Sequence, residues 1–172
     1  MKGLIAALAL LVVLGLGFFL YSSPAAPPPE MTDAEIAQIE AEVMAFADAW
    51  LDAWRGGADC DSNLPLLHPD RMAMPYEGEI INRDEWHEMC LMRTANVASA
   101  TFDWTNREVR VLAPDAAVFI GSYSATWEHL DDSPAEHVPI SSTGGVAERT
   151  PDGWVWTFYS WSPGTGEAVE EG

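Results

Sequence analysis

The chain has 172 residues, the usual length of one domain, and 48% of them are hydrophobic, enough for a packed core. Eight Lys and Arg against 27 Asp and Glu give a net charge of −19, which disfavours binding to nucleic acid or to an anionic membrane surface. Eight Trp, six Phe and four Tyr are a high aromatic content. Aromatic side chains fill cores and also line ligand pockets.

The N-terminal segment, residues 1–21, contains an uncharged apolar run at 4–21 that follows Lys2. This run is shorter than a typical spanning helix and longer than a typical signal-peptide core, so a retained anchor and a cleaved signal peptide both stay open. Small residues up to Ala25 suit signal-peptidase cleavage. Either hypothesis predicts a periplasmic or other extracytoplasmic location, with the chain tethered to the inner membrane or secreted after cleavage.

The rest of the chain divides into three parts by composition. Residues 22–30 are proline-rich and predict a short stiff linker. Residues 31–163 predict one folded domain. The acidic segment 164–172 predicts a disordered tail.

Two helices are predicted from capping signals. Thr32 and Glu35 form a capping box before a helix that ends at Gly56-Gly57. Its apolar stripe recurs at spacings of three and four and comprises Ile36, Ile39, Val43, Phe46, Trp50 and Trp54. Asn82 and Glu85 cap a second helix, whose inner face carries Trp86, Met89, Cys90, Arg93 and Val97.

Shorter elements are predicted between the two helices. Residues 58–63 predict a polar loop, 64–67 one helical turn, 72–76 a short strand and 77–79 a turn. Cys60 lies in the loop and Cys90 in the second helix. The pair either forms a disulfide, as an oxidising compartment favours, or stays as two separate thiols.

The second half of the domain predicts antiparallel strands at 101–112, 117–130, 138–149 and 154–161. Phe119, Tyr123 and Trp127 share one face of the second of these strands. Gly144-Gly145 predicts a β-bulge. In the last strand, alternation predicts one face with Trp156, Phe158 and Ser160, and an opposite face with Val155, Thr157, Tyr159 and Trp161.

Helices first and antiparallel strands afterwards predict an α+β fold with the helices on one face of the sheet. A curved sheet closed on one side by helices forms a cone-shaped barrel. The interior of such a cone is a natural pocket.

The order of these motifs resembles the nuclear transport factor 2-like superfamily, in particular its SnoaL-like (polyketide-cyclase-like) branch. The motifs are a long first helix, Leu67-His68-Pro69-Asp70, Gly78 before a capped helix, and Arg149-Thr150-Pro151-Asp152-Gly153-Trp154 leading into a strand that ends at Ser162. The resemblance covers about Met31 to Pro163. It implies a cone with a pocket, used by isomerases, dehydratases, cyclases and binding domains, so the fold does not decide the function.

The chain departs from the family pattern at two positions. Steroid-isomerase-like members carry an acidic base just before a proline in the first strand, whereas here Met74 precedes Pro75. Many SnoaL-like members carry a pocket histidine where this chain has Ser160. Both departures speak against the familiar acid/base mechanisms.

Three residues are the catalytic candidates. His68 and Asp70 form the nearest approach to a proton-transfer pair, or else they only terminate a helical turn. Asp103 acts as an acid or base if it points into the cone, where burial would raise its pKa, and is a solvated surface residue if it points outward.

The predicted ligand-binding residues are aromatic or hydroxyl-bearing. Tyrosines, including Tyr159, offer hydroxyl groups to a developing oxyanion, and tryptophans offer an aromatic cage. His87, His129 and His137 are expected to be exposed, and no metal or cofactor is expected. The predicted ligand-binding set is Tyr76, Trp86, Tyr123, Trp127, Trp156 and Ser160.

Three functions follow as hypotheses. The first is binding of a small hydrophobic molecule or a partner protein without turnover. The second is acid/base catalysis of the cyclase, dehydratase or isomerase type on a small hydrophobic substrate. The third is a structural role as a homodimer through the open face of the sheet.

Overall fold

The compact unit of the protein begins at Met31, and the computed structural model describes residues 30–55 and 59–163. The predicted N-terminal apolar helix, the linker apart from Glu30, and the acidic tail lie outside the described residues. No helix within the described ranges is long and apolar enough to cross a bilayer.

Two capped helices begin where the sequence predicts them, and both end earlier than predicted: the first ends at Asp52, and Val97, predicted on the second, lies in a strand. Helix α2 (Asp33–Asp52) begins at Thr32, whose Oγ1 accepts from Glu35 N while Glu35 accepts from Thr32 N (2.8 Å). Helix α4 (Arg83–Thr94) begins at Asn82, which accepts from Glu85 N (3.1 Å) in a second capping box. Each box satisfies backbone N–H groups that the first helical turn leaves unpaired.

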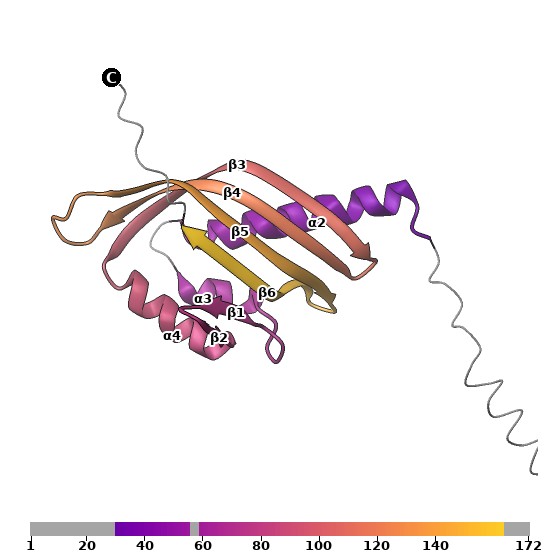
Figure 1. Ribbon diagram of the computed structural model, residues 1–172, viewed down its shortest axis with the longest axis horizontal. Helices are drawn as coiled ribbons and strands as arrows, with labels where there is room; N and C mark the ends of the chain where they lie inside the picture. The colour runs from indigo at the N-terminus through magenta and orange to yellow at the C-terminus, as the bar shows by residue number, and fades with distance from the viewer. Residues whose placement is uncertain (1–29, 56–58, 164–172) are drawn as a thin grey trace, which may run out of the picture. The chain divides into compact units, whose positions relative to one another are not determined.

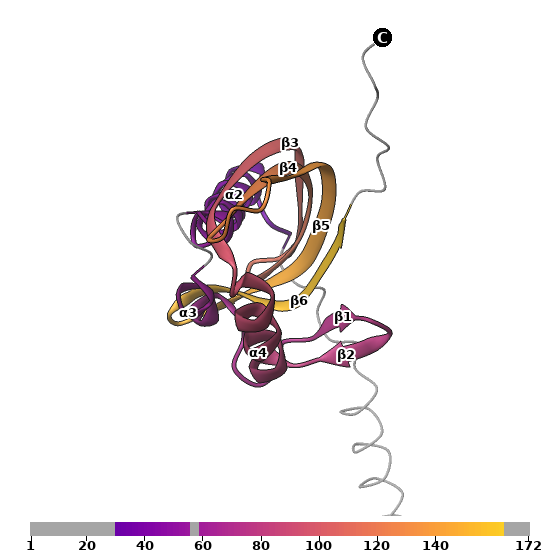
Figure 2. The ribbon, with the colours of Figure 1, turned by 90° about the vertical axis from the view of Figure 1, so that its left-hand side faces the viewer.

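Four long strands form one antiparallel meander in the order β3-β4-β5-β6. Their bounds are β3 (Val97–Ala113), β4 (Ala116–His129), β5 (Glu136–Thr150) and β6 (Gly153–Pro163). The sheet is strongly curved, and α2 runs along its concave side (Figures 1 and 2). This confirms the α+β prediction of a curved antiparallel sheet packed against helices.

Smaller elements lie together at one end of the curved sheet, as Figure 2 shows. They are α3 (Cys60–Asn63), the 3-10 helix η1 (Leu64–Leu66), the two-stranded sheet of β1 (Met74–Tyr76) and β2 (Glu79–Ile81), and α4. Isolated bridges pair Leu67 with Trp156 and Ala73 with Phe158. The connection between η1 and β1 is therefore hydrogen-bonded to the free edge of β6.

The core lies between α2 and the concave face of the sheet. Val43 and Ala47 of α2 are almost wholly buried, and the rings of Phe46 and Trp156 lie 4.6 Å apart between centroids. Phe119 of β4 closes the same cluster, 6.0 Å from Trp156. This aromatic cluster fills one part of the concave side, so a cavity can form only where the cluster ends.

Two short elements escaped prediction. The polar segment 59–63 folds as α3 because Asp59 caps it, accepting from Asp61 N (3.1 Å) and Ser62 N (3.2 Å). Strand β2 follows the predicted turn at Glu77-Gly78, where both residues have positive φ. A turn of this kind folds the chain back so that β2 pairs with β1.

The predicted β-bulge at Gly144-Gly145 is wrong, since both glycines pair regularly with β4 and β6. The irregularity in this region lies in β6, where Val146 pairs with Phe158 and Ala147 with Trp156, so that Thr157 is extra. Gly145 serves close packing instead. A Cβ there would lie 2.6 Å from Phe158 O and 2.7 Å from the Trp156 ring.

The bulge at Thr157 also overturns the predicted faces of the last strand. One extra residue reverses the alternation, so Trp156 on one side of the bulge and Tyr159 on the other are both buried. Phe158 is turned outward and is 37% exposed. Ser160, two residues after Phe158, lies on the same outer face of the strand and not on the cavity side where the sequence pattern placed it.

The two cysteines form a disulfide between Cys60 of α3 and Cys90 of α4, with Cα atoms 6.0 Å apart. The hypothesis of two separate thiols is therefore wrong. Both cysteines are buried. The bridge fixes α4 to the segment that follows α2.

Candidate functional site

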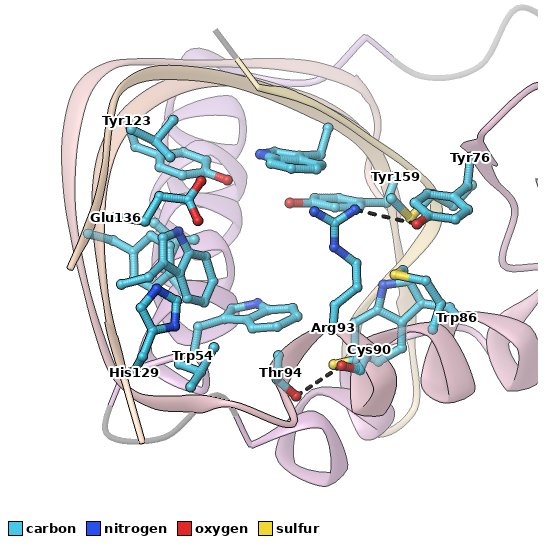
Figure 3. A pocket seen from close by; sticks show the side chains of 18 residues that line it. Trp54, Tyr76, Trp86, Cys90, Arg93, Thr94, Tyr123, His129, Glu136 and Tyr159 are labelled. Carbon is cyan, nitrogen blue, oxygen red and sulfur yellow. Dashed lines mark hydrogen bonds between the residues drawn. The ribbon is translucent and has the colours of Figure 1, made fainter. Parts of the chain in front are cut away.

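A cavity of about 360 Å³ opens where the aromatic core ends (Figure 3). Its walls come from the end of α2, β1, α4 and all four long strands. This volume lies within the range of small-molecule pockets. The curved sheet surrounds much of the cavity, and α4 forms another wall (Figure 3).

Aromatic rings dominate the lining, contributing eight of its eighteen residues. Trp54 packs edge-on against Trp86 at 6.0 Å and against Trp127 at 6.3 Å. Phe102 packs edge-on against Trp127 at 5.3 Å. Such edge-to-face contacts hold the rings in place and leave flat, apolar surfaces toward the cavity. The other aromatic lining residues are Tyr76, Tyr123, Tyr159 and Trp161.

Helix α4 turns one face toward the cavity. The residues of this face, Trp86, Met89, Cys90 and Arg93, all line the cavity; Met89 and Cys90 each lie three or four residues from both Trp86 and Arg93. Trp86 is 1% exposed and anchors the helix, and the disulfide from Cys90 to Cys60 ties the same helix to α3. The position of this wall is therefore fixed by packing and by a covalent bond.

Two tyrosine hydroxyl groups in the lining stay protonated. Burial raises the pKa of Tyr123 far above its ordinary value; the nearby Tyr159 adds to the rise, and hydrogen bonds with Trp161 and Ser141 oppose it. Burial likewise raises the pKa of Tyr159, against hydrogen bonds with Thr143 and Trp50. Neutral phenols can donate a hydrogen bond to a ligand oxygen, and they do not act as bases.

Side chains that can carry a charge at neutral pH are few in the lining: Arg93 extends from α4 on one side of the cavity, and Glu136 and His129 lie on the other side (Figure 3). Arg93 Nη1 donates to Tyr76 Oη (3.4 Å), and its guanidinium lies 5.4 Å from the Trp161 ring centre. The Nδ1 atom of His129 is buried and has no hydrogen-bond partner within residues 30–55 and 59–163. Among the described residues, no three His, Cys, Asp or Glu side chains are grouped closely enough to hold a metal ion.

The three catalytic candidates lie outside the cavity lining. His68 Nδ1 accepts from the backbone N–H groups of Asp70 and Arg71 (both 3.1 Å), so His68 terminates the turn there. Asp70 is exposed. Asp103 is also exposed, because its neighbours Phe102 and Trp104 point inward. Catalysis by these residues stays a prediction, and their positions give it no support.

The ligand-binding candidates divide into two groups. Tyr76, Trp86, Tyr123 and Trp127 line the cavity as a set. Trp156 is buried in the aromatic core, and Ser160 Oγ donates to Gly144 O (3.3 Å) away from the lining. The bulge at Thr157 accounts for the position of Ser160.

Sequence reasoning missed several lining residues as site residues, although signals for them existed. His129, expected to be exposed, is half-buried in the lining because it follows Trp127 by two residues in β4 and so shares its face. Arg93 was placed on the inner face of α4 without a role. The other two histidines are engaged elsewhere: His87 with Asp61 (2.8 Å) and His137 with Thr126 (3.0 Å).

No family model matches the chain, and no curated protein matches it. Solved structures do. A "putative dehydratase" of the nuclear transport factor 2-like family from Streptomyces avermitilis matches with a TM-score of 0.64 and 20% identity, over 76% of this chain and 99% of that one. A "putative scytalone dehydratase" from Novosphingobium aromaticivorans matches with a TM-score of 0.68 and 9% identity, over 78% and 89%.

The chain has the nuclear transport factor 2-like fold. The likeness extends beyond proteins named as enzymes. A "putative calcium/calmodulin dependent protein kinase II association domain" from Xanthomonas campestris matches with a TM-score of 0.60 and 22% identity, over 86% of this chain and 98% of that one. Identities this low establish the nuclear transport factor 2-like fold and leave the function to the cavity.

Proposed function

We propose that this domain, of the SnoaL-like kind, binds a small, flat, largely apolar molecule in the cavity and releases it unchanged. The observation that carries the proposal is the lining of eight aromatic rings around about 360 Å³. Apolar pockets of this size bury most of the surface of a small ligand. A few polar groups in the lining then set its orientation.

Binding without turnover ranks first because the polar lining lacks a preformed acid/base pair. Among the described residues, no hydrogen bond joins His129 to a tyrosine of the lining, and His129 Nδ1 has no partner. The two buried tyrosines are held neutral by burial. A general base needs a partner that orients it and matches its pKa to its task.

The test is calorimetric titration of the protein with two-ring aromatic compounds. The Trp127→Ala variant removes one wall of the cavity, and affinity should fall about 10-fold or more, since burying a large ring contributes roughly 2 kcal/mol. Trp154→Ala is the matched control: Trp154 packs on the sheet outside the cavity, under Arg149 and beside Glu42. Equal losses in the two variants would contradict the proposal.

A second function, acid/base catalysis, is favoured by two observations. His129 presents a buried, unpartnered Nδ1 in the cavity lining, and proteins of the same fold are named as dehydratases. We propose His129 as the base in that case, in place of His68, Asp70 and Asp103. Mass spectrometry of bound compounds after prolonged incubation decides: a change in ligand mass that His129→Gln abolishes supports catalysis, and an unchanged ligand opposes it.

A homodimer is a third proposal, resting on the outer face of the sheet. Ile120 is 47% exposed, Ile140 52% and Phe158 37%. Exposed apolar side chains on one sheet face suit association between copies, and association domains share the fold. Light scattering should give twice the chain mass, and Ile120→Asp should restore the monomer. A monomeric wild type at high concentration would exclude this role.

For location, we propose that the domain works outside the cytoplasm. The disulfide between Cys60 and Cys90 supports this, because such bonds persist in oxidising compartments. The N-terminal apolar run is the second support. Cell fractionation tests it: recovery with the periplasmic or inner-membrane fraction is expected, and recovery of reduced protein from the cytosol would contradict it.

A further inference from the structure

Arg93 stands apart from the other arginines of this chain. Five of the seven form ion pairs with carboxylates, and Arg83 donates to the Leu64 carbonyl. Arg93 has no acidic partner among the described residues, in a chain with 27 acidic side chains against eight basic ones. Of the two arginines without a carboxylate partner among the described residues, Arg93 is the one that lines the cavity.

Two neighbours aim the Arg93 guanidinium. The hydroxyl of Tyr76 in β1 accepts a hydrogen bond from Arg93 Nη1 (3.4 Å). The central carbon of the guanidinium, Cζ, lies 5.4 Å from the ring centre of Trp161 in β6. Figure 3 shows the side chain extending from α4 into the space between the aromatic walls. A guanidinium has five N–H donors, so most of them remain for a ligand.

The chemistry of the free donors selects the ligand group. A planar guanidinium fork matches a carboxylate, which it binds through two parallel charge-assisted hydrogen bonds. The aromatic walls require that the rest of the ligand be flat and apolar. Together they specify a molecule with an aromatic body and an acidic end.

Glu136 limits the number of charges that the ligand carries. Its carboxylate points into the cavity from β5 and forms no ion pair with Arg93 (Figure 3). A second negative charge on the ligand would meet Glu136 and the strongly acidic surface around it. His129, another titratable group of the lining, offers a hydrogen bond in either protonation state.

We propose that Arg93 binds the carboxylate of a small aromatic monocarboxylic acid whose ring system fills the cavity. This inference rests on the proposed binding function and names the class of its ligand. Arg93 supplies the anion contact, the tryptophans supply the apolar contact, and Glu136 excludes dianions.

The test compares two ligands of nearly the same shape, 2-naphthoate and its neutral amide 2-naphthamide, by calorimetry at pH 7.5. The wild type should bind the acid at least about 10-fold more tightly than the amide, the size of one charge-assisted contact. Arg93→Gln should lower the affinity for 2-naphthoate by about 10-fold or more and change the affinity for 2-naphthamide by less than about 3-fold. Glu136→Gln should raise the affinity for 2-naphthoate by about 2-fold to 5-fold.

Two controls separate the assignment from a structural effect. Arg110→Gln removes an exposed arginine that pairs with Glu108 and lies outside the cavity lining, and should change neither affinity. Arg93→Lys keeps the charge without the fork, and acid affinity should fall between the wild type and Arg93→Gln.

The outcomes distinguish the two proposals. If wild type binds acid and amide equally, or if Arg93→Gln weakens both alike, the carboxylate assignment is overturned and the cavity still binds aromatic molecules. If wild type binds neither ligand nor other aromatic compounds at millimolar concentration, the binding function itself fails, and the assignment of Arg93 fails with it.

Discussion

Removal of the Cys60–Cys90 disulfide should lower both stability and ligand affinity. The bridge joins residues 30 apart in sequence, a loop whose closure in the unfolded chain corresponds to about 3.7 kcal/mol at 25 °C. The Cys60→Ala/Cys90→Ala variant should therefore lose about 3–4 kcal/mol of unfolding free energy. Because Cys90 lies in the α4 wall between Trp86 and Arg93, loosening that wall should also weaken 2-naphthoate binding.

The assay is guanidinium chloride unfolding followed by tryptophan fluorescence. Reduction of the wild type should give the same loss as the double substitution, and the double variant should not respond to reductant. Peptide mapping under non-reducing conditions identifies the linked pair directly. The reasoning is refuted if the double variant unfolds within about 1 kcal/mol of the wild type, since the loop estimate predicts a loss several times larger.

Three further predictions concern packing and ionisation. Gly145→Ala should lower the free energy of unfolding in urea by about 2 kcal/mol or more, because the new Cβ would lie 2.6 Å from a backbone oxygen. In Gly144→Ala the nearest contact of the new Cβ is 3.3 Å, so the loss should be less than half as large. Asn63→Ala should lower the free energy of unfolding by about 2–3 kcal/mol, because the Asn63 amide is fully buried. Oriented to suit its neighbours, this amide donates to Trp50 O and accepts from Trp54 Nε1 (both 3.1 Å). The control is Asn96→Ala, at an exposed asparagine. Burial raises the pKa of Tyr123 and Tyr159 above the ordinary 10.0, so the native state keeps protons that the unfolded state loses, and stability should fall above pH 10 by about 1.4 kcal/mol per pH unit for each. Phenolate absorbance should then rise cooperatively with unfolding, and gradual titration of all tyrosines in folded protein would contradict this.

Local signals in the sequence predicted the helices and the strands well. The capping boxes at Thr32 and Asn82 depend on residues three apart, and both helices begin where these boxes place them. The alternation that puts Phe119, Tyr123 and Trp127 on one face of β4 holds through the strand. Four of the predicted ligand-binding residues therefore line the cavity.

Predictions failed where partners distant in sequence decide the outcome. The extra residue at Thr157 depends on how β6 meets β5, which no pattern within β6 reveals, and it moved Ser160 and Phe158 to the other face. The role of Gly145 depends on the Trp156 ring packed above it. The isolation of Arg93 from carboxylates became visible only once the ion pairs of the other arginines were known.

The most direct test of the binding function uses the indole N–H signals of the eight tryptophans in a nitrogen-15 NMR spectrum. Four tryptophans line the cavity and four do not, and Trp154 lies on the sheet outside it. On addition of 2-naphthoate, the largest shifts should fall on the four lining residues, and Trp154 should not move. Shifts centred on Trp154, or none at saturating ligand, would contradict the account. The lining tryptophans are Trp54, Trp86, Trp127 and Trp161.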